Sequence, residues 1–156
     1  MRMDEEHGVA EAAAQVDADP QCQDLSPTQR LALVNARIGQ GGYRQRMLRL
    51  WGGQCAVTAC MTPCALVASH AIAWTYSTNE QRLDEFNGLL LAASIDRLFD
   101  NGLISFSDDG SLLVDPSLVD EDLGAIGLSR VSCIRKLDPR HLPYLAAHRV
   151  TSGFAP

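Results

Sequence analysis

The segments Ala65-Leu-Val-Ala-Ser-His70, Gly88-Leu-Leu-Leu91 and Ile95-Asp-Arg-Leu-Phe-Asp100 decide the fold of this chain. The first two are short apolar runs typical of β-strands, and a polar, irregular stretch separates them. The third is predicted to be a helix that Ser94 caps and that Asn101-Gly102 ends, since glycine tolerates the left-handed conformation that follows a helix. The predicted order is strand, loop, strand, helix.

Three polar side chains stand at the junctions of these elements. His70 ends the first strand, Asn87 opens the second, and Asp96 lies in the first turn of the helix. An imidazole can take a proton from water near neutral pH, and a carboxylate binds hard cations. Each residue also has a structural interpretation: a hydrogen-bonded histidine, an Asn-Gly turn, and a carboxylate that complements the helix dipole. Their joint order favours a hydrolytic site.

The flanking sequence predicts further helices and one more hairpin, so the fold class is α+β. Ser26-Pro-Thr-Gln29 has the pattern of a capping box at a helix start, and Gly39 is expected to end that helix. A proline-led helix start is also expected at Asp138-Pro139. The other expected elements are a helix over 43–51, a β-type run over 55–58, a hairpin of 104–107 with 112–114, and a last helix reaching about Arg149.

Charge divides the chain of 156 residues into an acidic arm and a neutral remainder. Residues 1–27 hold seven acidic residues against Arg2 alone, a net charge of −6, whereas residues 28–156 hold 12 basic and 12 acidic residues. The first residues also carry few large apolar side chains, so they cannot offset the entropy lost on ordering. We therefore predict a flexible acidic arm over 1–25, a folded domain over 26–149 and a short tail over 150–156.

Composition excludes several classes of protein. No apolar run approaches the roughly 20 residues of a membrane span, and the acidic N-terminus is unlike a basic secretory signal. Five cysteines cannot all pair within one chain. The expectation is a reduced, cytoplasmic protein without a membrane partner. The acidic pI near 5.0 does not exclude a polyanionic partner, because the acid is concentrated in the arm.

The ordered set of fragments resembles the ββα-metal finger of HNH endonucleases, and in particular bacterial HNH nucleases related to restriction enzymes. The fragments are Arg37-Ile-Gly-Gln40, Tyr43-Arg44, Cys55-Ala-Val-Thr58, Ala68-Ser-His-Ala-Ile-Ala-Trp74, Asn79-Glu-Gln-Arg-Leu-Asp84, Phe86-Asn-Gly-Leu-Leu-Leu91 and Ile95-Asp-Arg-Leu-Phe-Asp-Asn-Gly-Leu-Ile104. The resemblance implies an HNH finger with N-terminal helices, an added hairpin and a C-terminal helix. It also implies a metal-dependent DNA endonuclease.

The resemblance assigns roles to particular residues. It implies that His70 is the general base, that Asn87 pins the loop and orients the base, and that Asp96 binds a divalent metal, Mg²⁺ or Mn²⁺. Ser69 stands where many relatives carry a ligand. DNA contacts are expected from Arg37, Gln40, Arg44 and Arg82. A structural zinc is not expected, because the spacings of Cys55, Cys60 and Cys64 differ from CxxC pairs. The oligomeric state is left open, with a homodimer as one alternative.

Departures from the family pattern favour a second hypothesis. Asp96 stands in place of the usual histidine and offers an oxygen ligand, whereas the neutral hydroxyl of Ser69 is a poorer ligand than a carboxylate. Ile72-Ala73 stands where relatives often carry Lys-Pro, so a phosphate contact is lost. The alternative is a catalytically weak or inactive nucleic-acid-binding module that retains the HNH fold.

Overall fold

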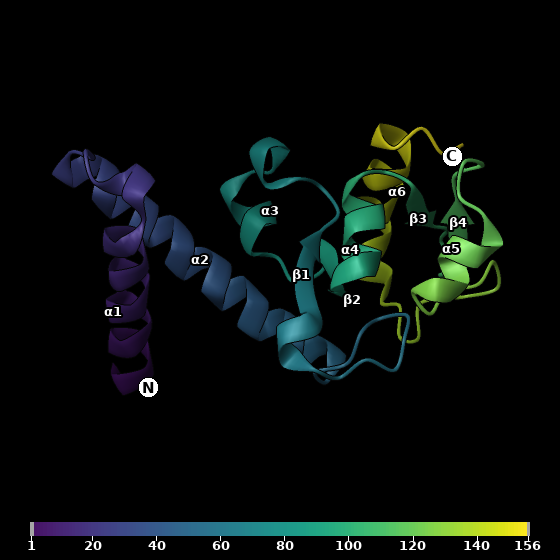
Figure 1. Cartoon of the computed structure of the whole chain (residues 1–156), viewed down its shortest axis with the longest axis horizontal. Helices are drawn as coiled ribbons and strands as arrows, with labels where there is room; N and C mark the ends of the chain where they lie inside the picture. Colours follow the sequence, from purple (N-terminus) through teal and green to yellow (C-terminus); the bar gives the residue numbers. More distant parts are fainter. Residues whose placement is uncertain (1, 156) are drawn as a thin grey trace. The chain divides into compact units, whose positions relative to one another are not determined.

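The computed structural model describes residues 2–155, with side chains from residue 9 onward. It combines helices with two small antiparallel pairs of strands, which agrees with the predicted α+β class (Figure 1). The chain divides into two compact units, residues 1–45 and residues 46–156. None of the helices described has both the length and the apolar character that crossing a membrane requires.

The first unit contains α1 (Arg2–Ala18), the short 3₁₀ helix η1 (Pro20–Cys22) and most of α2 (Pro27–Trp51). Where the sequence predicts a flexible arm, the structure has a helix. Val16 is buried and clusters with Val34 of α2. Asp17 accepts two hydrogen bonds from Arg30, at 2.7 and 2.6 Å. Ala12 and Val16, four residues apart on α1, thus pack on Val34 of α2. The acidic composition of the segment did not reveal this apolar contact.

Helix α2 begins as predicted and ends later than predicted. Ser26 Oγ accepts from the backbone N–H of Gln29, and the Gln29 side chain accepts from Ser26 N–H, which is the predicted capping box. The predicted stop at Gly39 is wrong, because α2 continues unbroken to Trp51. A glycine ends a helix where the backbone turns to positive φ, and the first glycine of the described chain to do so is Gly52, at +64°.

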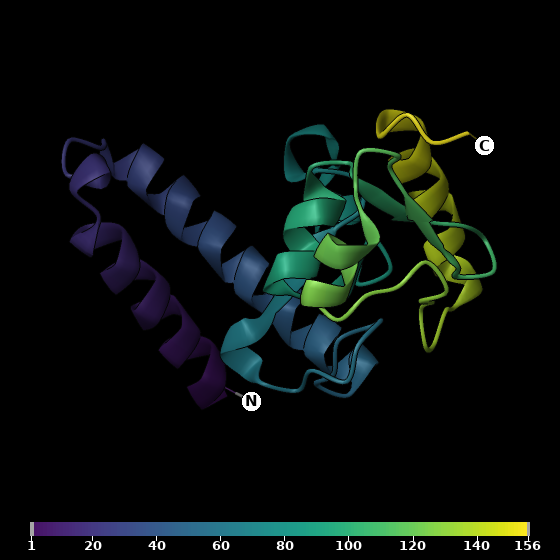
Figure 2. The ribbon, with the colours of Figure 1, turned by 45° about the vertical axis from the view of Figure 1, so that its right-hand side comes forward.

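The second unit is built on the predicted strand–loop–strand–helix order. β1 (Leu66–His70) pairs antiparallel with β2 (Gly88–Ala92), with Ser69 opposite Leu89 and His70 opposite Gly88. α4 (Ala93–Asp100) follows β2 at once and packs on β1 and β2 (Figure 2). Its buried residues Ile95 and Phe99, one turn apart, face the core.

The loop between β1 and β2 is more ordered than the sequence suggests. It contains the 3₁₀ helix η3 (Trp74–Tyr76) and the five-residue helix α3 (Asn79–Leu83), which Thr78 and Gln81 start with a capping box. Conversely, the predicted β-run at 55–58 is wrong. These residues form an irregular bend in which Ala56 N–H donates to Leu90 O at 2.7 Å, so Cys55 and Ala56 are buried without joining a ladder.

The remaining elements close the core of the second unit. The predicted hairpin is confirmed as β3 (Ile104–Phe106) and β4 (Leu112–Val114), with Gly110 at φ +85° in its turn. The structure adds η2 (Pro63–Ala65) and α5 (Asp120–Ala125), which the sequence did not predict. The last helix is η4 (Pro139–His141) followed by α6 (Leu142–Thr151).

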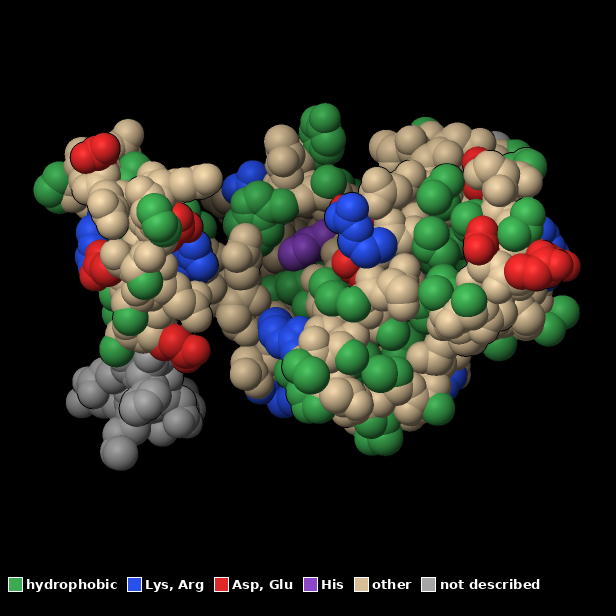
Figure 3. All heavy atoms as spheres, viewed as in Figure 1, with side chains coloured by type: hydrophobic (Ala, Val, Ile, Leu, Met, Phe, Trp, Pro, Cys, Tyr) green, Lys and Arg blue, Asp and Glu red, His purple; other side chains and the backbone are tan. Residues whose placement is uncertain are grey.

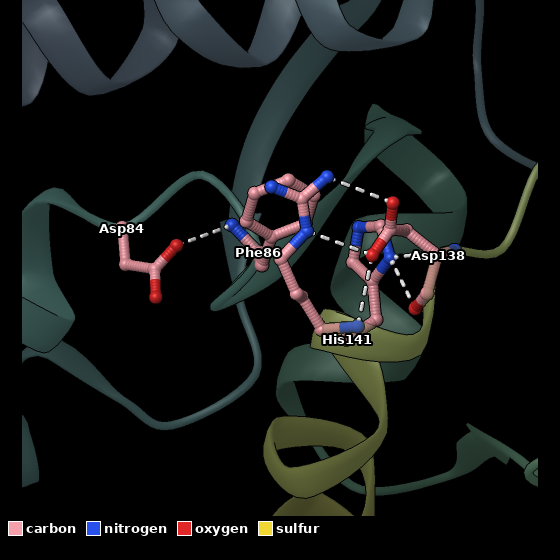
Figure 4. A network of polar contacts seen from close by, with 5 residues as sticks. Asp84, Phe86, Asp138 and His141 are labelled. Atoms are coloured by element: carbon pink, nitrogen blue, oxygen red, sulfur yellow. Dashed lines mark hydrogen bonds and ion pairs between the residues drawn. The ribbon is translucent and has the colours of Figure 1, made fainter.

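The start of that last helix is fixed by a polar network. The Asp138 side chain accepts from the backbone N–H of Arg140, and the Arg140 guanidinium lies 3.9 Å from the centre of the Phe86 ring (Figure 4). His141 is buried and packs edge-on against the same ring. The network joins the C-terminal helix to the residue that precedes Asn87.

Candidate active site

His70 occupies the last position of β1, half-buried at the edge of the strand pair. Its Nε2 lies 3.1 Å from the backbone carbonyl oxygen of Arg82, and its ring meets Trp74 edge-on with the ring centres 5.8 Å apart. A carbonyl only accepts, so Nε2 carries the proton in the neutral ring and Nδ1 carries the lone pair. Burial lowers the pKa of His70, and the hydrogen bond to Arg82 opposes this. The lowered pKa favours the neutral form of the imidazole.

Asn87 is fully buried and ties the two ends of the loop together. Its side-chain oxygen accepts from Ile72 N–H at 2.9 Å, and its side-chain amide donates to Gln81 O at 2.9 Å. The same amide lies 3.4 Å from Ser77 Oγ, which itself donates to Ile72 O. One amide thus holds the loop on both sides of η3, and this loop carries the carbonyl that contacts His70.

Ser69 and Asp96 meet on the face of β1 that α4 covers. Ser69 is buried, and its hydroxyl donates a hydrogen bond to the Asp96 carboxylate. Burial raises the pKa of Asp96 and the negative charge of Asp100 adds to the rise, whereas the bond from Ser69 lowers it. The Asp96 carboxylate and the Ser69 hydroxyl thus place oxygen donors side by side.

A cleft of about 450 Å³ opens beside His70. One wall is the end of β1 and the following turn, and the other consists of the C-terminal ends of α4 and α6. Figure 3, which colours side chains by type, shows one histidine side chain at the surface in its view, next to hydrophobic, basic and acidic side chains. The lining residues are 70–73, Tyr76, 100–102, 147–148 and 151–152.

The predicted DNA-binding residues are not gathered at this cleft. Arg37, Gln40 and Arg44 lie in the first unit, where Arg37 contacts Gln15 at 3.4 Å and Asp19 at 3.7 Å. Arg82 lies in the second unit. Its guanidinium covers the Trp74 ring at 4.9 Å, and its Nε donates to Trp74 O at 2.9 Å. This arginine therefore stiffens the loop beside His70.

The cysteines, His141 and His148 form no metal site in the described part of the chain. All five cysteines are free, and Cys55 is buried whereas Cys64 and Cys133 are exposed. His141 and His148 are buried, and they pack on the rings of Phe86 and Phe99 respectively. Within residues 9–155, no three His, Cys, Asp or Glu side chains are arranged to hold a metal ion.

Two features of the site were missed from sequence. Asp100 lines the cleft, and its spacing of four residues from Asp96 on one helix could have revealed it. Tyr76 and the residues at 151–152 form opposite parts of the lining, and no local pattern could bring segments so far apart in the chain together. That juxtaposition depends on how α6 packs.

Residues 55–107 match the model of a protein family described as HNH endonuclease. This segment includes His70, Asn87 and Asp96 and runs from the turn before β1 through β3. The resemblance inferred from the sequence fragments is thereby confirmed for this part of the chain, and it indicates nuclease activity in general. No curated protein matches the chain.

Proposed function

Because its segment 55–107 matches the HNH endonuclease family, we propose that this protein is a metal-dependent endonuclease that hydrolyses phosphodiester bonds in DNA. The observation that carries the proposal is the environment of His70. Its imidazole has a lowered pKa, is held by a carbonyl on one nitrogen, and borders a cleft. A neutral imidazole beside open space is what removal of a proton from water requires.

His70 is proposed as the general base. The oxygen of a water molecule bonds to phosphorus while its proton passes to the imidazole of His70, and the bond from phosphorus to the 3′ oxygen breaks. The hydrogen bond from Nε2 to Arg82 O orients the ring and stabilises the imidazolium that forms, because a carbonyl oxygen carries partial negative charge. Asn87 contributes as a positioning residue, through the loop that holds this carbonyl.

Asp96, with Ser69 beside it, is proposed to hold the divalent metal. The donors are oxygen atoms, and Mg²⁺ or Mn²⁺ accepts one or two carboxylates while keeping several waters. Such a site needs no cluster of three titratable ligands, so the described donor set fits a hard cation and does not fit zinc. When bound, the ion would neutralise charge on the phosphate and on the leaving oxygen.

A nucleic-acid-binding module with weak or no catalysis is the second candidate. Ser69 favours it, because its hydroxyl donates to Asp96 and offers a metal less charge than a carboxylate would. Ile72 and Ala73 also favour the non-catalytic module, because their side chains line the cleft and supply no positive charge for a phosphate.

Cleavage of supercoiled plasmid by the purified protein tests the proposal. We expect nicked and linear products with Mg²⁺ or Mn²⁺ and none with EDTA. His70→Ala should reduce the cleavage rate by at least about 100-fold, whereas His7→Ala, outside the matched segment, should cleave normally. Circular dichroism and DNA-binding anisotropy should show that His70→Ala folds and binds DNA. Metal-independent cleavage, or a His70→Ala rate within a few-fold of wild type, would contradict the proposal.

A further inference from the structure

The lining of the cleft beside His70 has an unusual charge pattern for a nucleic-acid site. None of its lining residues in the described chain is Lys or Arg, and one of them, Asp100, is acidic. Ala71, Ile72, Ala73 and Ala147 give it apolar walls. A surface that binds phosphates usually carries lysine or arginine. Because this cleft has neither, it is better suited to an uncharged part of a nucleotide.

An exposed aromatic side chain stands at the same cleft. Tyr76 is 83% exposed, and among the described residues it is the only aromatic one with a strongly exposed side chain. The other strongly exposed large hydrophobic residues of the described chain, such as Val131, have no ring. Flat aromatic rings stack on bases of any sequence, because every base has a π-face. The exposed Tyr76 ring beside the proposed general base is therefore suited to stack on a base of the substrate.

The backbone under Tyr76 is held firmly. Tyr76 N–H donates to Ala73 O at 2.9 Å, and Ser77 Oγ donates to Ile72 O at 2.9 Å and to Ala73 O at 3.1 Å. Asn87 fixes Ser77 and Ile72 in turn. A ring on a fixed turn loses little conformational freedom when it binds, which makes it an effective stacking platform.

From these observations we propose that the cleft binds the base of an unpaired nucleotide adjacent to the cleaved phosphate, with Tyr76 stacked on that base. The proposal rests on the proposed nuclease function and adds a substrate class, which is DNA with an unpaired nucleotide. A volume of about 450 Å³ accommodates a base together with its sugar. A base within a duplex cannot enter such a cleft, since it stays paired and stacked unless it is extruded.

Fluorescence anisotropy with the His70→Ala protein separates binding from cleavage. The probes are a labelled single strand, the perfect duplex of the same sequence, and that duplex with one unpaired 2-aminopurine. Adding Tyr76→Ala should weaken binding of the single strand and of the unpaired duplex by about tenfold and leave the perfect duplex unchanged. Tyr76→Phe should bind normally, because it keeps the ring. Val131→Ala, which removes an equally exposed side chain away from the cleft, should also bind normally.

The fluorescence of 2-aminopurine gives an independent readout. Stacking on Tyr76 should quench it in the His70→Ala protein and in its Tyr76→Phe derivative, and the quenching should be lost with Tyr76→Ala. Unchanged affinity and quenching in Tyr76→Ala, or an equal loss on all three probes, would overturn the base site. A different result would separate the two proposals. If the wild-type protein cleaves no DNA but Tyr76→Ala still weakens binding of the unpaired base, the nuclease proposal is contradicted and the base site is supported.

Discussion

The side-chain oxygen of Asn87 accepts a hydrogen bond from the backbone N–H of Ile72 at 2.9 Å, across 15 positions of the chain. The amide group of the same side chain donates to Gln81 O, so its two ends hold two sides of one loop. Asn87 itself is fully buried, so removing its side chain breaks both hydrogen bonds and leaves a cavity inside the loop. One amide therefore ties together the two sides of the loop that carries Tyr76 and the carbonyl facing His70, and Arg82 adds a bond to Trp74 O within that loop.

We predict that Asn87→Ala lowers the free energy of unfolding by about 3 kcal/mol, because it removes two hydrogen bonds to the backbone and creates a cavity at a fully buried position. Asn79→Ala is the matched control. Its side chain is exposed and contacts only the Arg82 guanidinium at 3.2 Å in the described hydrogen bonds, so the change should stay within about 0.5 kcal/mol. Urea denaturation of both variants measures the difference. Equal stability of the two variants would contradict the pinning role.

Local sequence signals predicted the elements around Asn87 well. The two apolar runs became β1 and β2, Gly102 has φ +69° after α4, and Ser26 caps α2 with Gln29. These signals operate within a few residues, through cap hydrogen bonds, backbone conformation and strand-length apolar runs. They were sufficient to place His70 at a strand end and Asp96 on a helix.

The errors arose where tertiary contacts override local preference. The segment at 55–58 reads as a strand because it is apolar, but its burial comes from packing against β2 and the chain near Arg135. The helix α1 is stabilised by the seam with Val34, which composition alone does not reveal. The opposite wall of the cleft, at 147–152, is joined to His70 only by the packing of α6.

Asp96→Asn tests the proposed metal site without changing side-chain volume. It should weaken Mn²⁺ binding by at least about tenfold, because an amide oxygen carries no net charge. Cleavage should fall with it and recover in part at higher Mn²⁺ concentration. Asp122→Asn, on the exposed face of α5, should match wild type. Titration calorimetry measures the affinities, and unchanged Mn²⁺ binding in Asp96→Asn would remove Asp96 from the set of ligands.

Acid should destabilise the protein through His148. This residue is buried, its Nε2 donates to Phe99 O at 2.9 Å, and its Nδ1 lies 2.8 Å from Ser105 Oγ. Burial lowers the pKa of His148, while the Phe99 carbonyl and the charge of Asp100 oppose this. The unfolded chain therefore binds the proton more readily than the folded one, so the stabilisation is fully present above about pH 6.5 and declines as the pH falls below it.

The measurement for His148 is the pH dependence of unfolding. Between about pH 6.5 and 5, the wild-type free energy of unfolding should decrease more steeply than that of His148→Gln, by up to about 1.4 kcal/mol per pH unit. A polar replacement preserves hydrogen-bonding capacity, so that the comparison concerns the proton and not an unpaired Ser105. Parallel curves for the two proteins would show that His148 does not titrate between the folded and unfolded states.

The last prediction concerns the acidic N-terminal residues. In the first unit, Asp17 pairs with Arg30 at 2.6 Å and Asp19 lies 3.7 Å from Arg37, one of the residues proposed to contact DNA. We therefore expect DNA phosphates to compete with these carboxylates for the guanidinium groups. Exposed ion pairs are weak and are screened above about 0.15 M salt, where the Debye length falls below about 8 Å.

Deleting residues 1–25 should therefore tighten DNA binding at low salt by about fivefold and have little effect at high salt. The deletion keeps Ser26 and Gln29, so the capping box of α2 remains. In the full chain, Asp17→Asn with Asp19→Asn should tighten binding in the same direction, and Glu121→Gln with Asp122→Asn on α5 should not. Anisotropy with labelled duplex across a salt series measures these affinities. Equal affinity of full-length and truncated protein at low salt would leave the acidic residues without an inhibitory role, since competition for the arginines is strongest there.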